Sequence, residues 1–339
     1  MTSVLRPAGP NDLPAIYEMA KSTGGGFTNL PPDREKLAEK LAAASAAFAR
    51  EEDAIGDDKF MFVLEDRSTR QAKGTCQIFS KIGSTWPFYS YRIDAFTQYS
   101  SELDRTIRSE LLTLCTDHSG CSEVGGLYLH AGERSTGNGA LLARSRYLFI
   151  RMHRERFAER TIAELRGVAD EGGESPFWDG VGGRFFGMKF HEADDFNAVH
   201  GNQFIADLMP KTPIYKAMLA ERALHVLGVP HVSGRPAMRM LAKEGFIFDK
   251  YVDIFDGGPT MTIATDEIAT IRDAREQVVA DIADPGNGAA RNIVATGRLA
   301  GFRCCLAQVS SIDDGLVIDP AAAEALGIAI GDRVTHVAR

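Results

Sequence analysis

A short apolar segment at residues 122–130 leads directly into a loop with two glycines and then into a long amphipathic stretch. The first segment has the length and the apolar alternation of a buried strand. The loop spans residues 133–139, and apolar side chains between 140 and 157 recur at helical spacing. We therefore predict a central strand, a tight loop and a helix that follow one another in space.

Strand-like and helix-like segments also alternate along the rest of the chain. This order is typical of an α/β (α+β) fold, in which helices cover a mixed sheet. Expected helices begin after Asp12, which we predict as an N-cap, and after Asp33 in a Pro-Pro-Asp turn. The strands expected outside the central one are residues 4–7, 60–65, 74–79 and 161–166.

The length of 339 residues exceeds what one hydrophobic core usually accommodates. After residue 260 the texture changes to short β-rich runs at 261–263, 292–296, 303–309 and 334–337. We predict a larger domain over residues 1–258 and a small β-rich domain over 259–339. Within 204–258, a helix that ends in Gly-Phe and a following strand weakly repeat an earlier part of the chain. This indicates either a duplicated element or chance similarity.

Composition argues against two broad classes of protein. The chain has 38 Lys plus Arg against 46 Asp plus Glu, a net charge of -8, so general binding of nucleic acid through its phosphates is not expected. No segment approaches the roughly 18 to 20 apolar residues that cross a bilayer. The five cysteines are scattered and the N-terminus lacks the apolar core of a signal peptide, so we expect a cytoplasmic protein. No ligand spacing indicates a metal site.

The glycine loop has the features of an anion site. A loop between a strand and a helix N-terminus directs backbone N–H groups at the positive end of the helix dipole. Gly137 and Gly139 have no Cβ to obstruct a phosphate, Arg134 adds a cation, and Asn138 and Ala140 supply further amides. The loop is thus a candidate pyrophosphate cradle, and it lacks the Gly-Lys-Ser/Thr of a Walker loop and the third glycine of a dinucleotide fingerprint. The alternative is a tight turn with no ligand.

With Arg134-x-x-Gly137-x-Gly139 after a strand, the chain resembles the GNAT acyltransferase superfamily. Over residues 1–260 it resembles more specifically the arginine N-succinyltransferase family. That likeness rests on GGGFTNLP (24–31), PFYSYR (87–92), DHSGCSE (117–123), AELRGV (163–168), SPFW (175–178), FIADLMP (204–210) and YVDIFDGGPT (251–260). The remainder resembles that family's small β-barrel tail. The resemblance implies a GNAT-like acyltransferase domain followed by this barrel.

The resemblance also implies an activity, which is transfer of the succinyl group of succinyl-CoA to the α-amine of L-arginine in arginine degradation. Succinyl-CoA would be a co-substrate, with no permanently bound cofactor, and the protein would be a homodimer or assemble with a paralogous chain. Leu127 matches the family's succinyl-CoA-binding leucine and His231 its proton-donating histidine. The family's His-Pro-Gln-Thr reads His-Val-Ser-Gly here.

The two substrates require charged partners. A succinyl carboxylate needs a fixed cation, for which Arg92 and Arg166 are candidates because each ends a strand-like run. The arginine guanidinium needs carboxylates, for which Glu174, with Asp170 and Glu171, is a candidate. Structural ion pairs are the alternative for both arginines.

The attacking amine must lose a proton, because its reference pKa is about 7.7 to 8.0. His231 can take that proton, and a main-chain N–H at or beside Leu127 can stabilise the oxyanion. Two other functions remain open. One is acylation of another amine, such as ornithine, or use of another acyl-CoA. The other is a CoA-binding regulatory module without turnover.

Overall fold

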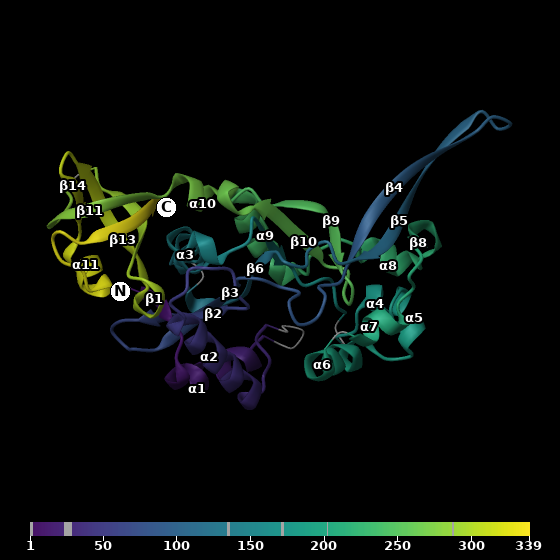
Figure 1. Ribbon diagram of the computed structural model, residues 1–339, viewed down its shortest axis with the longest axis horizontal. Coiled ribbons are helices and arrows are strands. Elements are labelled where there is room, and N and C mark those ends of the chain that lie inside the picture. Colours follow the sequence, from purple (N-terminus) through teal and green to yellow (C-terminus); the bar gives the residue numbers. More distant parts are fainter. Residues whose placement is uncertain (1–2, 24–28, 134–135, 171–172, 202, 287) are drawn as a thin grey trace. The chain divides into compact units, whose positions relative to one another are not determined.

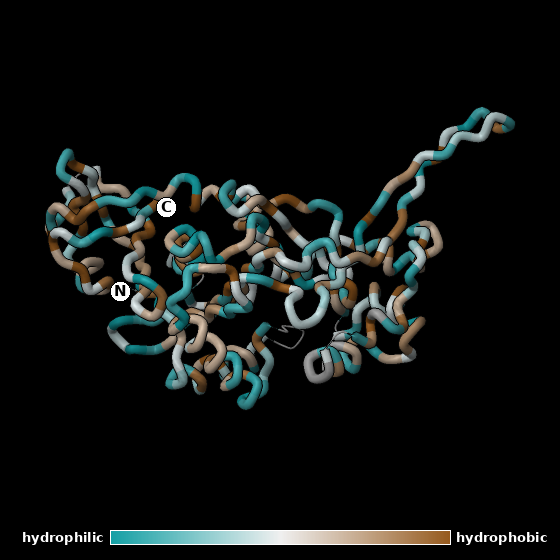
Figure 2. Tube along the Cα trace, viewed as in Figure 1, coloured by the Kyte–Doolittle hydropathy of each residue, from teal (hydrophilic) through white to brown (hydrophobic). Residues whose placement is uncertain are grey.

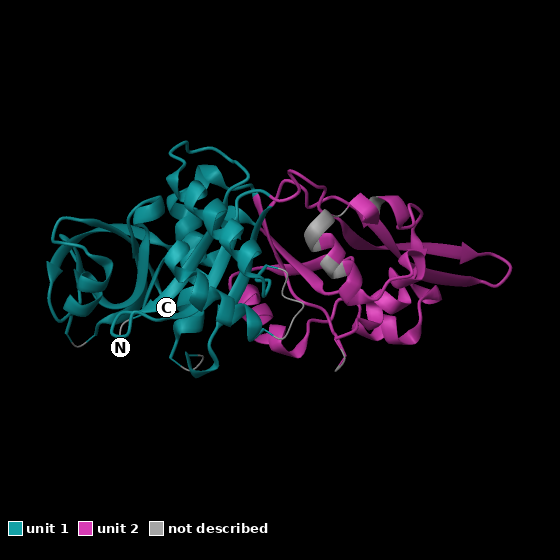
Figure 3. Cartoon of the chain, turned by 90° about the horizontal axis from the view of Figure 1, so that it is seen from below, with its two compact units in different colours: residues 1–81, 122–159, 264–339 teal, residues 82–121, 160–263 magenta. Residues whose placement is uncertain are grey.

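The computed structural model describes residues 3–23, 29–133, 136–170, 173–201, 203–286 and 288–339. The chain divides into two compact units (Figure 3). Unit 1 comprises residues 1–81, 122–159 and 264–339, and unit 2 comprises 82–121 and 160–263. The predicted domain boundary between 258 and 259 and the predicted duplicated element within 204–258 stay predictions.

Unit 1 contains an antiparallel sheet in the order β1-β2-β3-β6 (Figure 1). These strands are β1 (Ser3–Pro7), β2 (Lys59–Asp66), β3 (Ala72–Phe79) and β6 (Ser122–Leu129). All four were expected from the sequence, and β6 is the predicted central strand. Strand β2 pairs with β1 along one edge and with β3 along the other. Its residues are buried from Phe60 onwards. The predicted strand pattern is confirmed here.

Two helices of unit 1, α2 (Arg34–Ala49) and α3 (Asn138–Met152), pack on this sheet through phenylalanines. The unit also contains α1 (Leu13–Lys21) and α10 (Ala269–Asp273). Phe48 of α2 and Phe149 of α3 both contact Phe60 and Phe62 of β2, with ring centroids 4.8–5.3 Å apart. Asp33 caps α2 as expected, accepting N–H groups of its first turn. The core of unit 1 therefore lies where α2 and α3 meet β2.

Two expectations for unit 1 helices are wrong. Asp12 does not cap α1, because its carboxylate instead binds the Arg6 guanidinium and the Gly9 N–H. The helix expected to run to residue 157 ends at Met152. There His153 leaves helical geometry and a 3-10 turn, Arg154–Arg156, follows.

A closed β-barrel forms the C-terminal part of unit 1. Its strands are β11 (Arg275–Ile282), β12 (Ala290–Thr296), β13 (Arg303–Ile312), β14 (Gly315–Ile318) and β15 (Arg333–Ala338), with α11 (Pro320–Leu326) packed against them. Pairing runs β11-β14-β13-β12-β15 and back to β11. Strand β13 also pairs with β1, where Cys304 and Cys305 lie opposite Leu5 and Val4. The expected small barrel is confirmed.

Unit 2 has a second set of strands in the order β7-β10-β9-β4-β5-β8. They are β4 (Ser90–Ser100), β5 (Arg105–Cys115), β7 (Arg160–Glu164), β8 (Ile214–Tyr215), β9 (Ile247–Asp253) and β10 (Pro259–Ala264). The helices of this unit are α4 (Pro176–Gly180), α5 (Gly183–Phe186), α6 (Phe190–His200), α7 (Gln203–Leu208), α8 (Glu221–Val226) and α9 (Arg235–Lys243).

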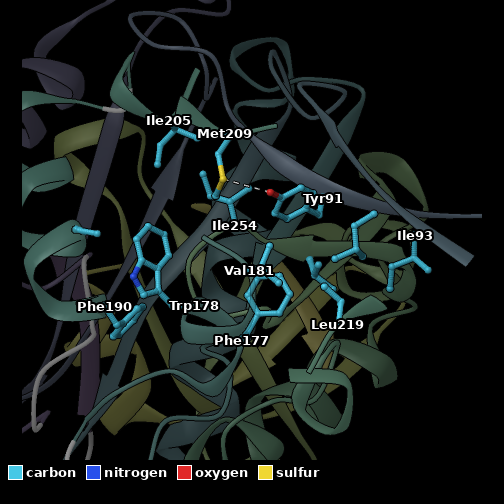
Figure 4. Close-up of a cluster of buried hydrophobic side chains, with 13 residues drawn as sticks. Tyr91, Ile93, Phe177, Trp178, Val181, Phe190, Ile205, Met209, Leu219 and Ile254 are labelled. Carbon is cyan, nitrogen blue, oxygen red and sulfur yellow. Dashed lines mark hydrogen bonds between the residues drawn. The ribbon is translucent and has the colours of Figure 1, made fainter. Parts of the chain in front are cut away.

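The core of unit 2 surrounds Trp178 and Phe177 of α4, which are fully buried (Figure 4). Tyr91 of β4 lies in the same cluster, and its hydroxyl donates to Met209 Sδ at 3.3 Å. The indole N–H of Trp178 donates to the Met188 carbonyl, so this large side chain is buried without losing its hydrogen bond.

Strands β4 and β5 extend as a long hairpin, the arm, from unit 2 (Figure 1). Within the described residues, β4 pairs with β9 only at 90–92 and β5 pairs with β8 only at 111–112. Farther out the two strands have only each other as neighbours. Hydrophilic residues predominate along this outer part (Figure 2). No helix in the described part of the chain is long and apolar enough to cross a membrane.

Candidate active site

Strand β6 has a bulge at the predicted acyl-CoA-binding residue. On β3, Thr75 pairs with Tyr128 and Gln77 pairs with Gly125, so Gly126 and Leu127 together lie opposite a single residue. Gly126 has a left-handed φ of 56°, a conformation that favours glycine. A bulge leaves the extra residue outside the regular ladder. Leu127 therefore lies at the irregular position of an otherwise paired strand.

The glycine loop connects β6 to α3 as predicted. Gly137 is the N-cap of α3 with a φ of 93°, which a side chain at this position would strain. The Asn138 side chain turns back, and its Nδ2 donates to Glu133 Oε2 at 2.9 Å. The Ala140 N–H donates to the Gly137 carbonyl at 3.2 Å. The Gly139 N–H has no acceptor among the described residues, and Arg134 lies outside them.

A cavity of about 620 Å³ adjoins the loop within unit 1. Its lining includes Glu133, Asn138 and, from other parts of the unit, Asp66, Asp319 and Arg291. Three carboxylates against one guanidinium disfavour an anion such as pyrophosphate. Gly139 does not line this cavity, and a pyrophosphate cradle on the Gly139 side of the loop stays a prediction.

His231 lies in unit 2, immediately before a 3-10 turn, Val232–Gly234. The backbone N–H of His231 donates to the Arg166 carbonyl at 2.8 Å, and Pro230 forms a β-bridge with Gly167. The structure therefore brings two of the sequence-predicted residues, His231 and Arg166, together. The imidazole is partly exposed, as a group that meets substrate must be.

Ser233 orients the imidazole. Its hydroxyl lies 2.7 Å from His231 Nδ1, and its backbone N–H lies 3.3 Å from the same atom. If Nδ1 accepts the N–H, Nε2 carries the proton of the neutral ring; if Nδ1 donates to the hydroxyl, Nε2 is a free base. Only the second form, in which Nδ1–H donates to the Ser233 hydroxyl, leaves Nε2 able to accept a proton; in the first form Nε2–H can only donate one.

The pKa of His231 is lowered from its ordinary value, first by burial and then by the positive charge of Arg166. A lowered pKa keeps the imidazole neutral at pH 7, which is the form that accepts a proton. The site therefore favours His231 acting first as a base, and as an acid only after it has taken up a proton.

Glu174 lies elsewhere in unit 2. Its carboxylate is 3.3 Å from His191 Nδ1 and 3.9 Å from Lys189 Nζ. Glu171, expected beside it, lies outside the described residues. The predicted role of Glu174 toward a guanidinium stays a prediction.

Arg92 lies inside β4, and not at the end of a strand as expected, because β4 continues to pair with β5 as far as Ser100. Its guanidinium binds Asp94 at 2.8 Å and Asp117 at 2.6 Å. These contacts match the structural ion pair that was the alternative. A role in binding the succinyl carboxylate stays a prediction.

Sequence reasoning missed a pair of buried carboxyls, Asp253 and Asp256, one of which contacts the segment that pairs with the chain before His231. Asp256 Oδ2 accepts the Gly167 N–H at 2.7 Å, on the segment that bridges to Pro230. The available signal was the spacing Asp-x-x-Asp-Gly-Gly, in which carboxylates commonly accept N–H groups of their own turn. Among the described residues, no three His, Cys, Asp or Glu side chains are grouped to hold a metal ion.

Family profiles match nearly the whole chain. The profile described as "Arginine N-succinyltransferase beta subunit" matches residues 3–270, and that of its C-terminal domain matches residues 275–338. The chain belongs to the arginine N-succinyltransferase family. As members of this family are acyltransferases, the expected class of enzyme is confirmed.

Individual relatives agree with the family assignment. The chain is 39% identical over 334 residues to arginine N-succinyltransferase subunit beta of Pseudomonas aeruginosa, covering 98% of this chain and 97% of the relative. It is 40% identical over 335 residues to arginine N-succinyltransferase of Citrobacter koseri, with the same coverage.

A solved structure has the same fold as this arginine N-succinyltransferase family member. Arginine/ornithine succinyltransferase subunit AI of Pseudomonas aeruginosa superposes with a TM-score of 0.90 at 33% identity, over 99% of this chain and 98% of that one. The expected fold class, a GNAT-like domain of mixed α/β type with a small C-terminal barrel, is confirmed.

We predict that Gly139→Val weakens CoA binding by about tenfold or more in this family member. The fold tolerates the change, because a Cβ at Gly139 would have Leu129 Cδ2 at 3.7 Å as its nearest neighbour. The new side chain would instead cover the side of the loop where we place the pyrophosphate. Titration calorimetry with CoA measures the effect.

The matched control for this prediction is Gly132→Val. Gly132 precedes the same loop, and a Cβ there would have open space around it. Its CoA affinity should equal that of the unchanged protein. Unchanged CoA affinity in a folded Gly139→Val protein would show that the loop is only a turn.

Proposed function

We propose that this protein transfers the succinyl group of succinyl-CoA to the α-amine of L-arginine, giving N2-succinyl-L-arginine and CoA. The observation that carries the proposal is full-length similarity, at 39 to 40% identity, to proteins named for this reaction. The superposed structure is of a protein named for arginine and ornithine. The reaction would open a route of arginine degradation in the cytoplasm.

In the proposed mechanism, neutral His231 takes a proton from the arginine α-ammonium through Nε2, directly or through one water. The free amine then attacks the thioester carbonyl and forms a tetrahedral intermediate. Main-chain N–H groups at the Gly126–Leu127 bulge stabilise the oxyanion, because donors fixed in advance need no reorganisation when charge develops. The C–S bond breaks, the imidazolium returns its proton to the CoA thiolate, and the nitrogen, which still carries two protons after the attack, releases one of them to solvent to give the amide.

Binding of the CoA portion and of the thioester end of succinyl-CoA is assigned to two parts of unit 1, and binding of the succinyl carboxylate to an arginine of unit 2. The Gly139 side of the loop, at the N-terminus of α3, would hold the pyrophosphate with Arg134, Gly137, Asn138 and Ala140. Leu127 would contact the acyl end. Arg92 or Arg166 would bind the succinyl carboxylate, and Arg166 is supported by its place beside His231.

A subunit partner is part of the proposal. The family profile and the Pseudomonas aeruginosa relative are both named for a beta subunit, and the solved relative for a subunit AI. We infer a homodimer or an assembly with a paralogous chain, which light scattering of the purified protein would distinguish from a monomer.

The test is release of free CoA, followed with a thiol reagent, for each pairing of succinyl-CoA or acetyl-CoA with L-arginine, L-ornithine, L-lysine or no acceptor. We expect the highest kcat/KM for succinyl-CoA with arginine, and a product heavier than arginine by one succinyl group. A faster reaction with ornithine would replace the acceptor. Background rates with every amine would instead favour the CoA-binding regulatory module.

A further inference from the structure

The backbone that carries His231 is held between two other segments of unit 2. On one side, the His231 N–H donates to the Arg166 carbonyl and Pro230 bridges to Gly167. On the other side, the Gly228 N–H donates to the Gly257 carbonyl at 2.8 Å. The position of His231 therefore depends on how segments 165–167 and 256–258 lie relative to each other.

Asp256 joins those two segments through its carboxyl group. Oδ2 accepts the Gly167 N–H at 2.7 Å, and Oδ1 accepts the Gly258 N–H at 2.8 Å. The Leu165 N–H also donates to the Pro259 carbonyl at 3.1 Å. The Asp256 carboxyl thus connects Gly167, which bridges to Pro230, with the turn between β9 and β10.

The two segments approach closely enough to require glycine on both sides. A Cβ on Gly167 would overlap the Asp256 carbonyl oxygen, and a Cβ on Gly258 would overlap the Leu165 carbonyl oxygen. Backbone overlap of this kind cannot be relieved by a side-chain rotation. Segments 165–167 and 256–258 can therefore cross this closely only with glycine at both positions. The Asp256 carboxyl bonds to both segments at this crossing.

Asp253 supports Asp256 from the same turn. Asp253 Oδ1 accepts the N–H groups of Phe255 and Asp256 at 2.7 and 2.8 Å. The pKa of Asp256 is raised by burial first and by the Asp253 charge second, and the pKa of Asp253 is raised by burial. A single proton shared between the two carboxyls would remove their repulsion.

We propose that Asp256, supported by Asp253, is a positioning residue that fixes the backbone of His231 against residues 165–167. The hydrogen bonds of the Asp256 carboxyl go to the backbone N–H groups of Gly167 and Gly258, so it acts through the segments it joins. The inference rests on the proposed role of His231 in the reaction, but the position of His231 can be measured without turnover.

The main test variant is Asp256→Asn. An amide offers one acceptor oxygen, and its NH2 group cannot accept the second N–H, so one of the two bonds at the crossing is lost. Displacement of a reacting group by about 1 Å can lower a rate by about 100-fold. We expect kcat to fall by about 10- to 100-fold with the KM for succinyl-CoA unchanged.

A second readout follows the imidazole directly. Burial lowers the pKa of His231 first, and the Arg166 charge contributes second. Loosening segment 165–167 in Asp256→Asn should move the His231 pKa toward its ordinary value of about 6.5, measured by NMR titration of labelled histidine. If Asp256 only filled space in the core, its replacement would not change the titration of His231.

Two further variants complete the experiment. Asp249→Asn removes an exposed carboxylate from the same strand, β9, and should change neither kcat nor the titration. Asp253→Asn keeps an acceptor for the turn and can donate to Asp256 in place of the shared proton, so it should retain kcat where Asp253→Ala loses it. This pair tests the inference even if Asp256→Asn does not fold.

A folded Asp256→Asn protein with unchanged kcat and unchanged His231 titration would overturn the inference, as would equal losses in Asp253→Asn and Asp253→Ala. Failure of the proposed function is a separate result. In that case His231→Ala keeps its activity while the His231 titration still moves in Asp256→Asn.

Discussion

Replacing His231 by alanine should lower kcat by about 10²- to 10⁴-fold, with CoA affinity and Tm close to those of the unchanged protein. The imidazole is partly exposed and its side-chain hydrogen bond is to Ser233, two residues away, so its removal leaves the core of unit 2 intact. Steady-state kinetics, calorimetry with CoA and thermal melting measure the three quantities. The matched control is His225→Ala, an exposed histidine of α8 that should be silent.

The pH dependence of kcat/KM provides a second test of the role of His231, and its direction can be predicted. Burial and Arg166 lower the pKa of His231, so its acid limb should lie below about pH 6.5. Because the proposed base acts when neutral, kcat/KM should rise as pH increases through that pKa, and this limb should vanish in His231→Ala. If the variant retained both its rate and its profile, proton transfer would have to be assigned to solvent or to another group of the site.

Phe149→Ala should destabilise the protein by about 3–5 kcal/mol, the usual cost of deleting a buried aromatic ring. Phe149 is fully buried on α3, with ring centroids of Phe60, Phe62 and Phe302 at 4.8, 5.1 and 5.1 Å. The cavity left behind would be surrounded by rings from β2, α2 and the chain before β13, which cannot collapse together. Urea denaturation followed by fluorescence and circular dichroism measures the loss.

The control for this prediction is Phe185→Ala, which removes a ring that is 47% exposed and should cost far less. A loss below about 1 kcal/mol in Phe149→Ala would show that the site repacks. Because α3 carries the glycine loop at its other end, we also expect CoA affinity to fall in Phe149→Ala under conditions where α3 frays.

Local signals in the sequence predicted elements that contribute to the core. The Pro-Pro-Asp33 turn and the Ala, Leu, Glu and Lys after it located α2, and the apolar run at 122–130 located β6. The arm gave no such signal, because the outer parts of β4 and β5 bury neither face and so have no apolar alternation. Strand β14 is four residues long, too short for a period to be recognised.

The candidate site shows the same division between local and distant contacts. The sequence predicts that His231 lies in a loop just before a helix, and its contact with Ser233 is local, two residues away. Its contact with the Arg166 carbonyl joins residues far apart in the chain, and so does the contact of Asp256 with Gly167. Asp12 shows the converse, because its local capping position is overridden by Arg6 from a neighbouring strand.

The pairing of β1 with both β2 and β13 bears on how the chain folds as it leaves the ribosome. Val4 pairs with Glu65 and with Cys305, so one edge of β1 finds its partner early in synthesis and the other only near the end. Unit 2 has all its residues once position 263 is made, whereas unit 1 needs the chain as far as β15 to close its barrel. The usual order, in which N-terminal parts complete first, is reversed here. Until β13 emerges, the nascent chain carries an unpaired edge at β1, the kind of edge on which chaperones act and aggregation begins.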